Sequence, residues 1–246
     1  MNTSTNQNQT PQPPKIPGRF LFEPMAEGTS PALVIEALLK YPGRIIYQLQ
    51  NNWRAALPIW LFLFVLLGMA AYGLVVGSFS GGAQIWIAPI KIMIGTVLSI
   101  LICLPSLYIF TCLSGIDARL RTVTGVFLAA LGLGAVLLIG FGPVAWIFSQ
   151  STDSVAFMGG LHIGLWAIGI LFGLRLLQAM GCLLGSARTH LKLWSVVFIV
   201  VCLQMMTTLR PILGASEHFL PKEKKFFLSH WLETMSAKAP ENRTSH

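Results

Sequence analysis

Five long apolar stretches constrain the fold of this chain more than any other feature. They lie at residues 56–76, 85–113, 123–148, 155–177 and 193–209. About 20 apolar residues in helical form cross the roughly 30 Å hydrocarbon core of a bilayer, so each stretch reaches or approaches the length of a span. Backbone groups in lipid must be satisfied within their own segment, which favours helices. The sequence therefore predicts an all-α fold: a polytopic membrane bundle of five transmembrane helices, with amphipathic surface helices at both ends.

The composition agrees with this prediction and excludes several soluble classes. Hydrophobic residues make up 54% of the chain and charged residues only 11%, whereas soluble domains carry about 25% charged residues. This excludes a disordered protein, a soluble enzyme with one compact core and a nucleic-acid-binding domain of the usual polar kind. The net charge of +8 is attributed to basic flanks that meet anionic lipid. Membrane lipids are therefore the expected partners, and no nucleic acid is expected.

Four regions are expected along the chain. The N-terminal arm at residues 1–28, rich in Asn, Gln, Thr and Pro, is predicted to be disordered. Residues 29–54 should form amphipathic cytoplasmic helices, and residues 55–213 the five-helix transmembrane domain. Residues 214–246 should form a C-terminal tail with a short amphipathic helix.

The segment before the first span carries helix signals but is too short and too polar to cross a membrane. Ser30 followed by Pro31 predicts a helix start, with the hydroxyl as cap and the proline in the first turn. Pro42 and Gly43 interrupt this pattern, and a second short helix should follow them. Two interpretations stay open: the helices lie on the membrane surface, or they pack against the spanning helices from below.

Basic residues in the short loops predict the orientation. Arg119 and Arg121 lie between the second and third stretches, and Arg188 and Lys192 between the fourth and fifth, whereas the other two loops have no Lys or Arg. By the positive-inside rule the N-terminus is cytoplasmic. The tail then lies outside, although its own basic residues go against the rule.

Tryptophans and glycines point to helix boundaries and helix packing. Five tryptophans fall at or near segment ends, where indoles prefer the interface: Trp53, Trp60, Trp86, Trp146 and Trp194. Three GxxxG spacings, which let helices approach closely, occur at Gly73 and Gly77, Gly160 and Gly164, and Gly169 and Gly173. We expect these glycines to pack the five helices against one another. The alternative is that they form a contact between chains.

Three basic residues are candidate contacts for lipid or an anion: Arg175, Lys91 and Arg210. Arg175 lies in the fourth stretch, where a charge at mid-bilayer costs about 2.5–3.5 kcal/mol. It either forms an anion, headgroup or ion-pair site inside the bundle or reaches the cytoplasmic interface. Lys91 is expected just below the outer surface. Arg210 ends the fifth stretch, where a cation suits the helix C-terminus.

No catalytic, cofactor-binding or metal-binding motif is found in the sequence. We therefore predict that the chain is not an enzyme and needs no cofactor. Several polar residues could all face the outer side, but their spacing matches no metal site: Asp153, His162, Glu217, His218 and His230. An enzyme that acts on lipid through the outer histidines is the weakest alternative.

The segment LPSLYIFTCLSG at residues 104–115, with APIK before it and LRPILG at residues 209–214, resembles a group of uncharacterised bacterial five-span proteins. These proteins are similar in architecture to the Yip1 family, whose members have a cytoplasmic N-terminal arm, five spans and a short exit on the far side. The resemblance covers roughly residues 30–235 and implies an architecture without catalytic residues. It also implies that the protein lies in the cytoplasmic (inner) membrane of a bacterium. The eukaryotic members are associated with membrane traffic and small GTPases. Their DLYGP motif is absent here, so a GTPase partner is not implied.

Together these features predict a non-enzymatic integral membrane protein of Yip1-like type. Its role would be organisational: binding lipid, or scaffolding a complex with another membrane protein. The alternative is a small transporter or channel component with Arg175 lining the path. The sequence does not predict an oligomeric state.

Overall fold

The computed structural model describes residues 23–25, 30–51, 56–115, 119–183 and 188–208. All regular structure within these ranges is helical, which confirms the predicted all-α class. The helices are α1 (Pro31–Lys40), α2 (Pro42–Asn51), α3 (Ala56–Ser80), α4 (Gln84–Leu113), α5 (Leu120–Ser151), α6 (Val155–Leu183) and α7 (Arg188–Thr208).

Four helices in the described part of the chain, α3 to α6, are long and apolar enough to cross a membrane. They coincide with the first four predicted stretches and extend them by a few residues. The chain is therefore a multi-pass integral membrane protein. The fifth predicted stretch lies in α7, which contains a shorter apolar helix at Thr189–Met205.

Large apolar side chains cover the outer surface of the long helices. Leu67 of α3, Trp86 of α4 and Leu101 of α4 are all more than half exposed. A soluble monomer rarely shows an apolar surface of this extent, because water penalises it. Surrounding hydrocarbon removes that penalty, so the distribution of side chains agrees with a bundle embedded in lipid.

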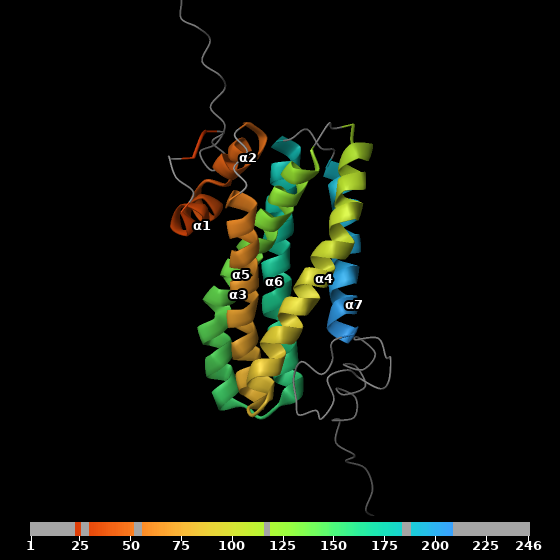
Figure 1. Ribbon diagram of the computed structural model, residues 1–246. Coiled ribbons are helices and arrows are strands. Elements are labelled where there is room, and N and C mark those ends of the chain that lie inside the picture. The colour runs from red at the N-terminus through yellow and green to blue at the C-terminus, as the bar shows by residue number, and fades with distance from the viewer. Residues whose placement is uncertain (1–22, 26–29, 52–55, 116–118, 184–187, 209–246) are drawn as a thin grey trace, which may run out of the picture.

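Figure 1 shows the helices as an elongated bundle with α1 and α2 at one end. We call this end the amino-terminal end, and the opposite end, where α3 leads into α4 and α5 into α6, the far end. α5 packs between α3 and α6. α4 begins beside α3 at the far end and runs obliquely across the bundle to α7 (Figure 1), against which it packs toward the amino-terminal end.

Glycines set the closest helix contacts, as the GxxxG spacings predict. A Cβ atom at Gly73 of α3 would lie 2.5 Å from Cα of Pro89 in α4. A Cβ atom at Gly173 of α6 would lie 2.7 Å from the carbonyl oxygen of Ala130 in α5. These glycines therefore serve packing within the chain. Gly164 differs, because a Cβ atom there would meet nothing within 4 Å.

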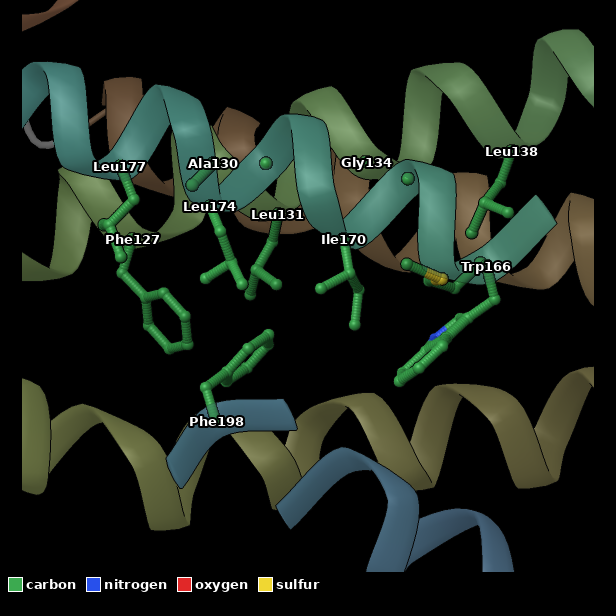
Figure 2. Close-up of a pocket in the computed structure, with 13 residues that line it drawn as sticks. Phe127, Ala130, Leu131, Gly134, Leu138, Trp166, Ile170, Leu174, Leu177 and Phe198 are labelled. Carbon is green, nitrogen blue, oxygen red and sulfur yellow. The ribbon is translucent and has the colours of Figure 1, made fainter. Parts of the chain in front are cut away.

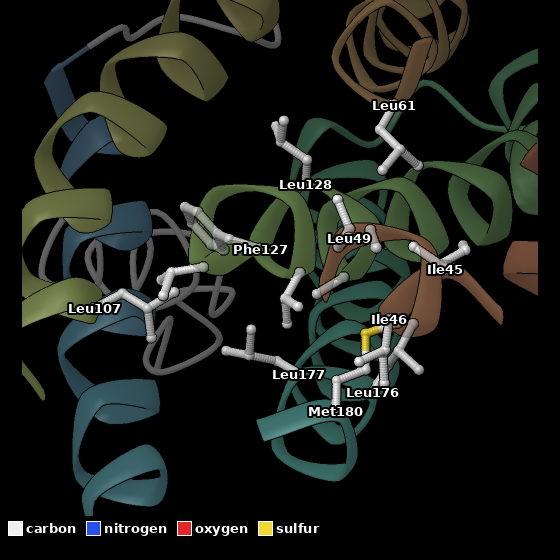
Figure 3. Packing of buried hydrophobic residues seen from close by; sticks show 14 of the residues in the cluster. Ile45, Ile46, Leu49, Leu61, Leu107, Phe127, Leu128, Leu176, Leu177 and Met180 are labelled. Atoms are coloured by element: carbon white, nitrogen blue, oxygen red, sulfur yellow. The ribbon is translucent and has the colours of Figure 1, made fainter. Parts of the chain in front are cut away.

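Helices α1 and α2 pack against the amino-terminal end of the bundle, which agrees with the second of the two interpretations of residues 29–54. Ile45 and Leu49 of α2 lie buried among side chains of the spanning helices (Figure 3). Leu49 occupies the space that Gly125 of α5 leaves open, because a Cβ atom at Gly125 would lie 2.5 Å from Cδ2 of Leu49. The predicted cap of α1 is also confirmed: the Ser30 hydroxyl accepts a hydrogen bond from the amide of Leu33.

The tryptophans at segment ends divide into two groups. Trp60, Trp86 and Trp146 are exposed, as expected for residues at a membrane interface. The prediction for Trp194 is wrong, because its side chain is fully buried and its indole N–H donates to the Ser106 hydroxyl of α4 over 3.0 Å. The first turns of α7 lie against α4, so a residue near the helix start faces a neighbouring helix instead of lipid.

Several predictions fall outside the described residues. They concern the disorder of the N-terminal arm, the position of Trp53, the short helix in the tail at 214–246, and four polar or charged residues of the C-terminal part, Arg210, Glu217, His218 and His230.

Candidate functional site

An apolar crevice lies between the α5–α6 pair and α7 and encloses a volume of about 40 Å³. Leu131 of α5 and Ile170 and Leu174 of α6 point toward Phe198 of α7 across it, as Figure 2 shows. Trp166 of α6 lines it toward the far end. All of its lining residues are apolar, aromatic or glycine. We refer to this space as the crevice.

Glycine packing between α5 and α6 explains how the crevice arises. A Cβ atom at Gly134 of α5 would lie 3.3 Å from the carbonyl oxygen of Gly169 in α6, so the two backbones are close together. The larger side chains beside this contact, including Leu131 and Ile170, must point away from it. They point toward α7, which pairs with α4 and leaves the crevice incompletely filled.

Two aromatic rings, those of Phe127 and Phe198, form the wall of the crevice nearest the amino-terminal end, and Trp194 packs behind them. Phe127 of α5 meets Phe198 edge to face, with ring centroids 5.6 Å apart, and Trp194 stacks on Phe198 with centroids 5.4 Å apart. The hydroxyl of Ser106 accepts the hydrogen bond from Trp194 and donates its own to the Cys103 carbonyl oxygen. This chain of contacts anchors α7 to α4 and fixes the position of Phe198.

A buried hydrogen-bonded pair lies one helical turn beyond the far end of the crevice. The Tyr72 hydroxyl of α3 and Nδ1 of His162 in α6 are 2.8 Å apart, and the two rings meet edge to face. Tyr72 packs in the same apolar cluster as Leu138 and Trp166, which also line the crevice. His162 is only 8% exposed, because α6 turns this residue toward Tyr72 of α3 inside the bundle.

Arg175, the first of the basic candidate residues, is exposed on α6 and does not line the crevice. Its guanidinium carbon lies 5.8 Å from the centroid of the Phe172 ring. Arg175 comes twenty residues after Val155, the first residue of α6. That is ~30 Å along a helix, the thickness of the hydrocarbon core. This position favours the interpretation that Arg175 reaches the interface at the amino-terminal end, and it gives no support to a path that Arg175 lines.

Lys91, the second basic candidate, is buried within the bundle and comes seven residues after Gln84, the first residue of α4 at the far end. Its side chain is 1% exposed. It follows Pro89, where α4 is in backbone contact with α3. Lys91 does not line the crevice. The third candidate, Arg210, lies outside the described residues.

The site can bind by apolar contact along the crevice and by hydrogen bonding at the Tyr72–His162 pair. Among the described residues, no group of three or more His, Cys, Asp or Glu side chains is close enough to hold a metal ion. Sequence reasoning missed the crevice and also missed Tyr72. The only signal for Tyr72 is a hydroxyl inside an apolar stretch, and its partner lies 90 residues further along the chain.

No family model, no curated protein and no solved structure matches this chain.

Proposed function

We propose that this chain is a five-span, non-enzymatic protein of Yip1-like architecture that binds a membrane lipid in the crevice and organises its membrane surroundings through that lipid. The crevice is the observation that carries the proposal. Its lining is apolar, and α5 and α6 are membrane-spanning helices, so lipid and not water surrounds this part of the bundle. A hydrocarbon chain gains van der Waals contact there without leaving any polar group unpaired.

The size of the crevice limits how a lipid is held. A water-sized group needs about 10–15 Å³ of such a cavity, so a volume of about 40 Å³ has room for about three or four heavy atoms. A whole acyl chain does not fit inside. It lies along the crevice, with one side against α6 and the other toward the bilayer. We therefore expect a lipid that exchanges with the bilayer and is not permanently enclosed.

Helix length and charge support a fifth span and a cytoplasmic N-terminus. α7 has 21 residues, which corresponds to ~31 Å and is enough to cross the hydrocarbon core. Basic residues gather at the amino-terminal end of the bundle, on α1, α2 and the first turns of α5 and α7: Lys40, Arg44, Arg121 and Lys192. By the positive-inside rule this end lies in the cytoplasm.

A substitution that fills the crevice tests the proposal. Ile170→Trp adds a large ring where Ile170 lines the crevice. Ile168→Trp is the matched control, because it places the same ring on the exposed face of the same helix, where Ile168 is 38% exposed. Both variants and the wild type are purified in mild detergent, and the co-purifying lipid is quantified by mass spectrometry.

We expect Ile170→Trp to lose most of the co-purifying lipid, because the ring takes the place of the hydrocarbon chain. Ile168→Trp should keep the amount found with the wild type. Equal lipid content in all three proteins, together with unchanged thermal stability, would contradict lipid binding in the crevice.

A further inference from the structure

His162 makes one hydrogen bond but has two ring nitrogens. Nδ1 pairs with the Tyr72 hydroxyl over 2.8 Å. Nε2 is buried and has no hydrogen-bond partner among the described residues. Buried polar atoms in proteins are almost always paired, so an unpaired nitrogen in a membrane-embedded histidine points to a partner that comes from outside the chain.

The hydrogen bond at Nδ1 determines what that partner must be. Among the described residues, the Tyr72 hydroxyl pairs with Nδ1. A phenol that accepted this bond would leave its own buried hydrogen unpaired, so we assign the hydroxyl as the donor and Nδ1 as the acceptor. A neutral imidazole carries one hydrogen, which then lies on Nε2. Nε2–H is therefore a donor, and its missing partner is an acceptor oxygen.

The depth of the Tyr72–His162 pair in the membrane limits which kind of oxygen can accept the hydrogen bond from Nε2–H. His162 comes seven residues after Val155, and Tyr72 eight residues before Ser80, the helix ends at the far end of the bundle. These separations place the pair ~10–12 Å along the helices from that end. A charged phosphate is costly to bury at such a depth, whereas a neutral carbonyl oxygen accepts one hydrogen bond without bringing a charge.

The pair also lies one helical turn from the crevice, on both of its helices. Trp166, which lines the crevice, follows His162 by one turn of α6, and Met69, which also lines it, precedes Tyr72 by one turn of α3. Leu138 contacts both regions, because it lines the crevice and packs in the cluster around Tyr72. The polar pair therefore continues the apolar crevice toward the far surface.

We infer that the Tyr72–His162 pair binds the carbonyl oxygen of a lipid whose hydrocarbon chain lies in the crevice, with His162 Nε2–H as the donor. This inference rests on the proposed function. Two kinds of membrane molecule supply a carbonyl oxygen on a long hydrocarbon chain: a glycerophospholipid, through an ester, and an isoprenoid quinone, through its ring. Tyr72 is a positioning residue, because it fixes the tautomer and the orientation of the His162 ring.

The test compares three probes on the full chain, reconstituted in nanodiscs of diether phospholipid, which has no ester carbonyl. The probes are an isotope-labelled diester phosphatidylethanolamine, the corresponding labelled diether lipid and a long-chain isoprenoid quinone. The amount of each probe retained is measured by mass spectrometry. His162→Phe keeps a ring but removes the donor, and His162→Gln replaces the donor with an amide N–H.

We expect wild-type protein to retain the diester lipid or the quinone about three- to tenfold better than the diether lipid, the ratio that one neutral hydrogen bond supports. His162→Phe should abolish this preference, and His162→Gln should restore most of it. The probe that shows the preference identifies the source of the carbonyl oxygen. In the wild type, the infrared stretch of that carbonyl should lie at a lower frequency than in bulk lipid.

Two results separate the failure of this inference from the failure of the proposed function. Equal retention of all three probes by the wild type, with Ile170→Trp still releasing them, would overturn the carbonyl site and leave lipid binding in the crevice intact. Equal retention of all probes that Ile170→Trp does not change would overturn both. Because the diester and diether lipids are compared on the wild type, the inference stays testable even where His162→Phe does not fold.

Discussion

Gly73 illustrates how a single absent side chain decides a helix contact. Its backbone lies so close to Pro89 that a Cβ atom has no room, and the nearest atom is backbone, which cannot rotate away. The spacing of Gly73 and Gly77 predicted such a contact. Which partner the glycines would meet could not be predicted, because the same spacing serves contacts within one chain and contacts between chains.

Gly73→Ala should destabilise the protein by about 1–3 kcal/mol, the usual cost of overpacking a filled contact. The free energy of unfolding is measured in mild detergent with increasing SDS. Gly164→Ala is the control, since a Cβ atom there meets nothing within 4 Å, and replacing a glycine by alanine in a helix interior otherwise favours the helix. Similar unfolding free energies for both variants would show that α3 and α4 are not in backbone contact.

Trp194 and Lys91 show why individual side chains were hard to place from the sequence. Both lie near helix ends, where tryptophan prefers the interface and lysine extends toward water. Both are buried here. Trp194 of α7 lies against α4, and Lys91 lies in the part of α4 that contacts α3. The position of a residue in an apolar stretch predicts how far along the helix it lies. The direction in which its side chain points depends on the neighbouring helices.

Helix α2 is the element whose role the sequence left open. Its apolar residues could lie in the membrane surface or against the bundle, because both environments accept the same amphipathic pattern. In the structure these residues pack against the bundle, and the Leu49 side chain fills the space beside Gly125 of α5. The existence of α1 and α2 followed from Ser30, Pro31 and the interruption at Pro42, which are local signals.

Leu49→Ala should release α2 from the bundle, because Leu49 is 1% exposed and its loss leaves a cavity above Gly125. Substitutions of this kind in a core cost about 2–5 kcal/mol. Hydrogen exchange of the α2 amides should accelerate at least tenfold, while the amides of α3 to α6 keep their protection. Gln50→Ala, at the exposed neighbouring position, should leave exchange unchanged. Unchanged α2 exchange in Leu49→Ala would mean that lipid, and not α5, holds this helix.

The helices of the bundle were largely predictable from the sequence, and the crevice between them was not. Hydropathy gave the number and approximate ends of α3 to α6, because lipid imposes length and apolarity on any helix that crosses it. The crevice depends on the direction of α4 and on the contact between Gly134 and Gly169, which no local pattern encodes. The Tyr72–His162 pair likewise joins helices that are distant in sequence.

The orientation is tested by labelling single cysteines on intact cells with a membrane-impermeant maleimide, in a background without the four native cysteines. Gln150→Cys at the far end should be labelled, and Glu36→Cys in α1 should be labelled only after the cells are opened. Ser245→Cys should be labelled on intact cells, because five spans place the C-terminus outside. Protection of Ser245→Cys on intact cells would contradict α7 as a fifth span.

Lipid binding in the crevice can be observed by photocrosslinking. A phospholipid with a diazirine in the middle of its acyl chain is incorporated into membranes that contain the protein, and the labelled peptides are identified after irradiation. We predict that labelling concentrates on the crevice residues of α6 and α7, around Ile170 and Phe198. Ile170→Trp should abolish this labelling, and Ile168→Trp should not. Labelling spread evenly over the exposed faces of all spanning helices, and equal in the two variants, would contradict it.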